Sequence, residues 1–161
     1  MTEAAQENNQ AQANTQPMFN MEKIYVKDLS LEIPHAPQIF LERENPQIEV
    51  QLHSQAAPVD EGVFEVTVMS TVTAKVGEKV MFLIEAKQAG IFQVRNLPDG
   101  ELEPVLAVMC PTILFPYLRE VVSDLAVRAG FAPVMLSPVN FDGLYQQQKQ
   151  QQAEAAKATT H

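Results

Sequence analysis

Residues 62–90 carry the clearest hydrophobic pattern of the chain, which is that of one long β-hairpin. In the first arm one parity is apolar and the other is mostly polar: Phe64, Val66, Val68, Val72, Ala74 and Val76 alternate with Glu65, Thr67, Met69, Thr71, Thr73 and Lys75. The second arm repeats this, with Val80, Phe82, Ile84 and Ala86 against Met81, Leu83, Glu85 and Lys87. Successive side chains of a strand point to opposite faces, so each arm has a core face and an outer face.

The turn of this hairpin follows from the requirement that both apolar sets face one core. An odd number of loop residues brings the two sets to the same face, so we expect a three-residue turn of Gly77, Glu78 and Lys79. The outer face then carries Leu83 and Glu85 beside threonine and methionine side chains. That face is semi-polar rather than fully solvated.

Shorter alternating patterns before the hairpin predict two further strands. Residues 19–33 form the first, and its parity changes near Lys27, which indicates a β-bulge. Residues 48–52 form the second, followed by an expected loop over residues 56–60 that contains Pro58. The sheet therefore has four predicted strands.

Helical spacing begins after the turn sequence at residues 97–100. A long helix is predicted over residues 103–129, kinked or divided near Cys110 because Pro111 removes a backbone donor, and capped by Gly130. Its apolar stripe is Leu114, Leu118, Val121, Val122 and Leu125. A last helix is expected to open at Ser137-Pro138. Four strands followed by two helices favour an α+β fold, with an antiparallel sheet and both helices on one face.

Composition divides the chain into a core and two tails. Residues 1–17 and 146–161 are rich in glutamine, asparagine and alanine, and after Met1 they contain no aromatic side chain and no aliphatic one larger than alanine. Such segments bury too little apolar area to offset their conformational entropy. We therefore expect a disordered tail over 1–17, one domain over 18–145, and a polar tail over 146–161 that is partly helical or disordered.

Charge and cysteine content narrow the classes of function. A net charge of −9 argues against nucleic-acid binding, which needs lysine and arginine to neutralise phosphate. The single cysteine, Cys110, allows no internal disulfide and fits a reducing compartment. No signal peptide is visible, and the apolar runs are shorter than the roughly 20 residues that span a bilayer. We expect no membrane insertion.

Motifs for catalysis and metal binding are absent from the sequence. The three histidines lie in unrelated contexts, His35 fits a surface loop, and Cys110 before a proline fits a small core residue better than a nucleophile. No phosphate-binding glycine loop or nucleophile elbow occurs. The sequence therefore predicts no catalytic residue, no metal and no cofactor, although a small enzyme with an undetected site is kept as an alternative.

Binding is better supported than catalysis. A sheet covered on one face exposes the other, and here that face is expected to carry Met69, Met81 and Leu83. The long helix is also apolar beyond one stripe, with Ile113, Phe115, Tyr117 and Val127. Such a helix is usually buried on more than one side, which favours self-association. The alternative is that these side chains fill a monomeric core.

Several segments together resemble the SecB protein-export chaperones of proteobacteria. They are residues 24–32 (IYVKDLSLE), 82–85 (FLIE), 90–92 (GIF), 110–120 (CPTILFPYLRE) and 138–142 (PVNFD), in the order in which that family has them. The resemblance covers residues 19–145. It implies an ATP-independent cytoplasmic holdase that keeps presecretory polypeptides unfolded, passes them to the SecA motor ATPase, and forms a homotetramer built as a dimer of dimers.

The resemblance also implies roles for individual residues. The SecA-contacting positions correspond to Asp28, Glu32, Leu83 and Glu85. Positions tied to tetramer integrity correspond to Ile84, Ala86 and Gln88, and the sandwiched main helix adds Leu114 and Leu118 to the expected oligomer interface. Client-groove positions correspond to Phe40, Ile48, Val50, Leu52, Phe141, Leu144 and Tyr145. One departure is Glu44, which stands where some members have a tryptophan, so an aromatic subsite is weakened. A small oligomeric structural module without clients is the other alternative.

Overall fold

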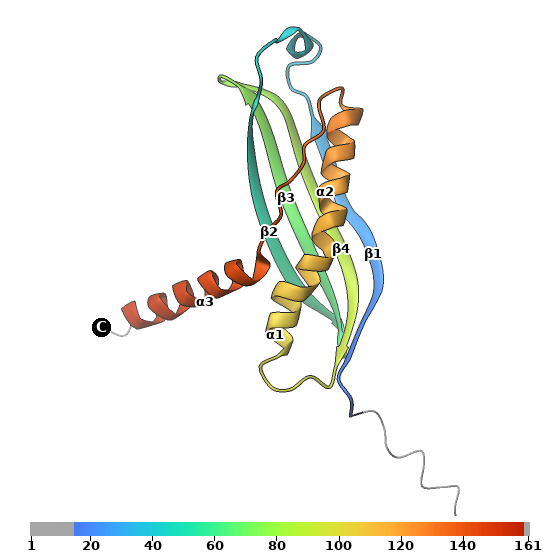
Figure 1. Cartoon of the computed structure of the whole chain (residues 1–161), viewed down its shortest axis with the longest axis vertical. Coiled ribbons are helices and arrows are strands. Elements are labelled where there is room, and N and C mark those ends of the chain that lie inside the picture. The colour runs from blue at the N-terminus through green and yellow to red at the C-terminus, as the bar shows by residue number, and fades with distance from the viewer. Residues whose placement is uncertain (1–14, 160–161) are drawn as a thin grey trace, which may run out of the picture.

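The computed structural model describes residues 15–159, which form an antiparallel sheet with one long helix lying across it (Figure 1). The sheet has the strand order β1-β4-β3-β2. Its strands are β1 (Met18–Glu32), β2 (Gln47–Asp60), β3 (Val63–Val76) and β4 (Lys79–Arg95). A short 3₁₀ helix, η1 (Gln38–Leu41), joins β1 to β2 at one end of the sheet. The predicted α+β class with a four-stranded antiparallel sheet is confirmed.

The outer strands of the sheet, β1 and β2, differ from their predicted forms in length and regularity. The bulge expected near Lys27 is present, because the register of β1 shifts between Val26 and Asp28, and a second shift at Glu22 was not predicted. The predicted loop over residues 56–60 is wrong, since β2 continues to Asp60. Pro58 is tolerated there because β2 is an edge strand whose free side needs no backbone donor.

The β3–β4 hairpin keeps both apolar sets on one face, but the predicted three-residue turn is not what brings them there. Val76 pairs with Lys79, so the turn is the two-residue Gly77-Glu78 and the three-residue prediction is wrong. Gly77 has a φ of 58°, in the left-handed region that glycine adopts without strain. The extra residue lies inside β4, where the register skips Met81. A bulge therefore makes the parity correction that we had assigned to the turn.

The long helix is continuous but changes its winding at Cys110, where the sequence predicted a kink or a division. A short α1 (Leu102–Pro104) leads into a π-helical stretch, η2 (Val105–Met109), which changes to α2 (Cys110–Arg128) at the Cys110-Pro111 step. The helix ends as expected at Gly130, whose φ is 88°. The wide π turns before Pro111 accommodate a residue that cannot donate a backbone hydrogen bond.

The core lies between α2 and the covered face of the sheet. The helix contributes Leu114, Leu118, Val122 and Ala126, all fully buried, and β3 and β4 contribute Val66, Val68, Val72, Ile84 and Phe92. These sheet residues share one parity on paired strands, so they form one apolar surface under the helix. We call the opposite side of the sheet the outer face.

The last helix, α3 (Phe141–Ala158), differs from its prediction at its start, and its continuation to Ala158 agrees with the partly helical form allowed for the C-terminal tail. It begins at Asn140, whose side-chain oxygen accepts a hydrogen bond from the Gly143 amide at 3.0 Å, and not at Ser137-Pro138. Of the helix only Phe141 is buried, and the remainder projects away from the sheet (Figure 1). The expectation that this helix packs along the sheet is therefore met by its first turn alone.

Among residues 15–159, one helix is long and apolar enough to cross a membrane by length and composition. It is the continuous Leu102–Arg128 stretch of 27 residues, and only 33% of its most apolar window is buried. One such helix is weak evidence for a membrane span, because core helices of soluble proteins pass the same test. The sequence prediction counted uninterrupted apolar runs, and charged residues such as Arg119, Glu120 and Asp124 interrupt this helix. The helix therefore presents an apolar side that the sheet does not cover.

Candidate functional site

The four predicted SecA-binding residues lie together on the outer face. Ser30 and Glu85 are paired across β1 and β4, as are Glu32 and Leu83, and Asp28 pairs with Lys87 one step further along. The three carboxylates are exposed and Leu83 is partly exposed. We call Asp28, Glu32, Leu83 and Glu85 the docking face. The structure thus brings them onto one surface away from α2, although nothing in it shows a partner.

A polar hollow of about 400 Å³ lies beside the docking face and reaches across the sheet to β2. Asp28, Glu85 and Lys87 form one side of it, and His53 and Met69 form the other. Because acidic, basic and apolar groups meet here, the hollow suits a partner with mixed polar chemistry better than an apolar ligand.

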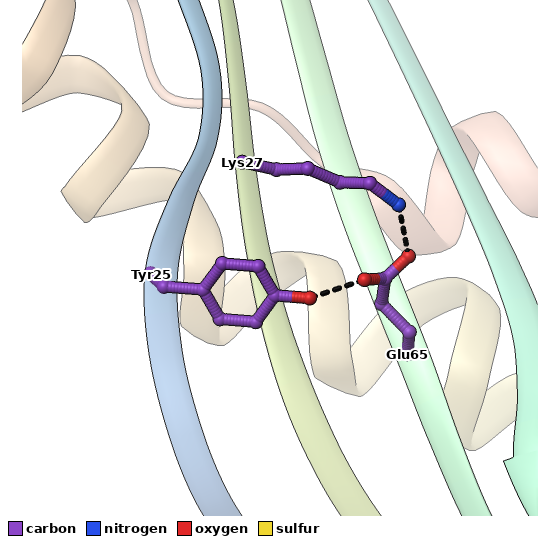
Figure 2. Close-up of polar contacts among 3 residues, drawn as sticks. All are labelled: Tyr25, Lys27 and Glu65. Atoms are coloured by element: carbon purple, nitrogen blue, oxygen red, sulfur yellow. Dashed lines mark hydrogen bonds and ion pairs between the residues drawn. The ribbon is translucent and has the colours of Figure 1, made fainter.

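A hydrogen-bonded cluster ties β1 to β3 on the outer face (Figure 2). The Lys27 ammonium lies 2.5 Å from Glu65 Oε1, and the Tyr25 hydroxyl donates to Glu65 Oε2. The hydrogen bond from Lys27, followed by that from Tyr25, lowers the pKa of Glu65. Burial and the adjacent carboxylate raise the pKa of Tyr25 to about 12. Sequence reasoning missed this cluster, although it placed the bulge at Lys27.

On the helix side of the sheet, a first apolar groove lies between β2 and the segment that follows α2. It encloses about 460 Å³, and we call it the Phe131 groove after its central ring. Its lining comprises Pro46, Ile48, Val50, Met81, Phe82, Phe131, Ala132, Pro133, Val134, Met135, Leu136 and Ser137. Phe131 stacks on Phe40 at a centroid distance of 5.2 Å and lies 4.8 Å from the ring of Phe82. Met81, predicted on the outer face, is buried at this groove instead.

A second apolar groove lies at the other end of β2, against the start of α3. It encloses about 510 Å³ and we call it the α3 groove; Phe141, Leu144 and Tyr145 line it together with Leu102 and Leu106. The Lys149 ammonium lies 2.8 Å from Glu103, which ties α3 to α1.

The predicted client residues therefore divide between the two grooves. Ile48 and Val50 line the Phe131 groove and Phe40 supports it, whereas the aromatic and leucine side chains of α3 line the other. Leu52 lies between them along β2 and packs partly buried against the core. Glu44 is exposed and lines neither groove.

The residues that sequence reasoning missed belong to the segment between the two long helices. Phe131, Val134, Met135 and Leu136 form a wall of the first groove, and no part of the segment has helical or strand periodicity. The signal that could have identified it is an apolar run interrupted by Pro133 with no regular element to bury it.

The five predicted oligomer-interface residues lie inside the protomer. Ile84, Ala86, Gln88, Leu114 and Leu118 are each 3% exposed or less, packed between α2 and the sheet. Their role in assembly stays a prediction, and these side chains present no surface of their own to a partner. Any effect on assembly must act through the seating of α2.

The apolar residues that made α2 a candidate for self-association divide between core and surface. Phe115 is buried, with its ring centroid 5.9 Å from that of Phe141, so it fills the monomeric core as the alternative held. Met109, Tyr117 and Val127 are between 47% and 52% exposed. The uncovered side of the helix thus carries large apolar side chains beside the exposed charges of Glu120, Asp124 and Arg128.

Within residues 15–159, no three histidine, cysteine, aspartate or glutamate side chains gather as a metal site. Cys110 is buried, and its burial raises its thiol pKa to about 12, opposite to what a nucleophile requires. His35 and His53 are exposed. The described residues thus provide binding surfaces, and no arrangement among them resembles a catalytic centre.

Comparison with known proteins finds similarity over most of the chain. The family described as preprotein translocase subunit SecB matches residues 12–152. Among curated relatives, the protein-export protein SecB of Methylobacillus flagellatus is 58% identical and that of Chromobacterium violaceum 59%, each over 91% of this chain and 93% or 98% of the relative. That of Aromatoleum aromaticum is 63% identical over 83% of this chain and 85% of its own length. The family match spans the residues of the sheet, the long helix and both grooves.

A solved structure with the same fold is the SecB-like chaperone of Mycobacterium tuberculosis, which was determined in complex with a ChAD peptide from an antitoxin. It has a TM-score of 0.60, is 19% identical, and covers 75% of this chain and 90% of its own length. At that identity the likeness concerns the fold alone. The family match and the curated relatives together show that this chain belongs to the SecB family of protein-export chaperones.

Proposed function

We propose that this protein is an ATP-independent holdase that binds unfolded presecretory polypeptides in its two helix-side grooves and delivers them from its outer face to SecA. The observation that carries the proposal is the separation of these surfaces: the grooves lie beside α2 and the docking face on the opposite side of the sheet. A client and the motor can then be bound at the same time.

The grooves suit unfolded chains because they are open, apolar and sparse in directional polar groups. Unfolded polypeptides expose apolar side chains, whose removal from water drives binding without a side-chain code. Both grooves follow β2, so a client that runs along this strand can occupy them in succession. The peptide complex of the mycobacterial relative supports the use of this fold for holding a polypeptide segment.

The docking face suits a basic partner. Asp28, Glu32 and Glu85 are exposed carboxylates close to one another, and the chain as a whole carries a charge of −9. Charges at the rim of an interface act mainly on association rate and on salt dependence. We therefore expect binding of SecA to weaken as ionic strength rises.

The assembly that we propose is a homotetramer, a dimer of dimers, in the cytoplasm. The uncovered side of α2 supports it, because Met109, Tyr117 and Val127 form an apolar surface on a helix that is mostly unburied in one protomer. The mass of the native protein by light scattering tests this directly. Tyr117→Asp places a charge on this surface and is expected to shift the mass toward smaller species, whereas an unchanged mass would exclude the surface from assembly.

Client holding is tested by the aggregation of an unfolded secretory precursor. The purified protein should suppress light scattering in proportion to its concentration and without nucleotide. Absence of suppression would refute the holdase and leave a structural module without clients. Glu85→Lys should weaken SecA binding and leave suppression intact, because this residue lies on the face opposite the grooves. Equal loss of both activities would contradict the separation of surfaces.

A further inference from the structure

The bulge at Lys27 decides which way the first two docking residues point. Before it, Ile24 and Val26 pair with β4 residues on the covered face; after it, Leu29 and Leu31 do so. Only an extra residue between Val26 and Asp28 lets both pairs face the core, because successive side chains alternate between faces. The same extra residue sends Asp28 and the carboxylate at position 32 to the outer face.

The Lys27 side chain at this bulge is fixed from two strands away. Its ammonium lies 2.5 Å from the carboxylate of Glu65 on β3, and the Tyr25 hydroxyl donates to the second oxygen of the same carboxylate. Between them, β4 contributes Ala89, which is fully buried and pairs with Tyr25. Figure 2 shows both side chains reaching across β4 to Glu65.

We propose that Tyr25, Lys27 and Glu65 are positioning residues for the docking face, which hold the β1 bulge so that Asp28 is presented beside Glu85. This inference rests on the proposed function of that face. Asp28 follows Lys27 directly and shares the polar hollow with Glu85, so a change in the bulge moves one carboxylate relative to the other.

The role is one of local orientation, because the register of β1 does not depend on the cluster. Ile24 before the bulge and Leu31 after it pack partly buried against the core, and their packing holds the register on both sides of Lys27. Glu65 also keeps one hydrogen-bond partner when the other is removed. Single substitutions in the cluster should therefore leave the fold intact and free the bulge.

The experiment compares single variants of the full-length protein in their affinity for purified SecA from Chromobacterium violaceum, whose SecB relative is 59% identical. Tyr25→Phe removes one hydroxyl and no charge, and Lys27→Met removes a positive charge near an acidic surface. If charge alone mattered, the first would be silent and the second would strengthen binding to a basic partner. Positioning predicts that both weaken it, by about threefold to tenfold, the effect of one well-oriented charged contact.

Two further variants distinguish positioning from general loss of structure. Lys27→Arg keeps the ion pair with Glu65 and should bind SecA with the affinity of the wild type. Lys23→Met removes a charge from the same strand and face outside the cluster, and should not weaken binding. Thermal midpoint, native mass and suppression of precursor aggregation should stay unchanged for Tyr25→Phe and Lys27→Met, with midpoints within about 4 °C of wild type.

The outcomes separate this inference from the function on which it rests. If Glu85→Lys leaves SecA binding unchanged, the docking face itself is refuted. If Glu85→Lys weakens binding but Lys27→Met strengthens it and Tyr25→Phe is silent, the docking face stands and the positioning role is overturned. If Tyr25→Phe weakens SecA binding only together with client holding or native mass, the cluster is structural and the inference is likewise refuted.

Discussion

The three phenylalanines around the Phe131 groove should separate client holding from stability when each is changed to alanine. Phe82, Phe131 and Phe40 form a row of rings, with centroid distances of 4.8 and 5.2 Å. The row runs from the core to the surface, because Phe82 is 2% exposed and Phe40 is 46% exposed. Phe131 lies between them and lines the groove. The inner ring should therefore govern stability and the outer one the shape of the groove.

Burial sets the size of each effect on the free energy of unfolding. Phe82→Ala removes a fully buried ring, which costs about 3–5 kcal/mol. Full burial of a phenylalanine contributes roughly 1.5–3 kcal/mol, so a ring that is about half exposed contributes ~1 kcal/mol. Its aromatic pair with Phe131 adds ~0.5–1.5 kcal/mol. Phe40→Ala should therefore cost about 2 kcal/mol, close to half the cost of the inner ring.

Phe40→Ala should separate client holding from stability, whereas Phe82→Ala affects both because Phe82 lines the groove as well as filling the core. Without Phe40, the Phe131 ring loses the partner on its solvent side and no longer forms a fixed wall, so affinity for an unfolded precursor should fall by about threefold to tenfold. Leu41→Ala is the matched control, because Leu41 lies next to Phe40, is 75% exposed and lines neither groove. Urea denaturation gives stability and precursor binding gives function, both at one fixed protein concentration because assembly contributes to stability.

Two results would refute the reasoning. Equal losses of stability in Phe40→Ala and Phe82→Ala would show that burial does not determine how much each of the three rings contributes to stability. Client affinity in Phe40→Ala equal to that of Leu41→Ala would show that the groove does not depend on the fixed position of Phe131. The first result concerns the core and the second the groove, so each can fail alone.

Further predictions concern packing, reactivity and pH. Gly90→Ala should destabilise the fold by about 1–3 kcal/mol, because the new Cβ would lie 2.8 Å from the buried Phe92 ring and 3.0 Å from the Leu114 side chain. Urea denaturation should show a smaller cost of Gly90→Ala in a Leu114→Ala background. An equal cost in both backgrounds would exclude the contact with Leu114. Cys110, whose thiol pKa burial raises to about 12, should react with a thiol reagent only in urea, and rapid reaction of the native protein would contradict its burial. Since Lys27 lowers the pKa of Glu65, the carboxylate stabilises the fold above the ordinary glutamate pKa and loses this effect as the pH falls through the lowered value. The stability difference between wild type and Glu65→Gln, followed by thermal melts, should therefore shrink on acidification; a constant difference would contradict this.

Most of the fold that could be predicted came from the alternation of apolar and polar residues along the strands. The alternation of residues 62–90 identified the core face of β3 and β4, and the change of parity at Lys27 located a bulge that is present. The alternation pattern gave the wrong hairpin turn, because it shows that one extra residue is needed but not where in the hairpin that residue lies. An odd residue in the turn and one in a bulge at Met81 satisfy the same requirement.

The site was less predictable because it depends on contacts between distant segments. Phe40 and Val50 could be named from the resemblance, but the wall opposite them comes from residues 131–136, whose irregular backbone has no periodicity to read. The Glu65 cluster joins residues 38 and 40 positions apart. The start of α3 at Asn140 was missed because Ser137-Pro138 offers equally good capping chemistry three residues earlier.

The alternation along β4 also explains how neighbouring residues can have separate effects. Ile84, Ala86 and Gln88 point under α2 and are buried, whereas Leu83 and Glu85 lie on the outer face. A larger side chain at the buried positions must lift α2, and the uncovered side of α2 is the surface proposed for self-association. Substitutions on this parity should therefore alter native mass before they alter binding on the outer face. Substitutions on the other parity should alter SecA binding alone. One face of β4 then affects assembly through α2, and the other presents the proposed docking residues. The two properties can change independently because successive side chains of the strand point to opposite faces of the sheet.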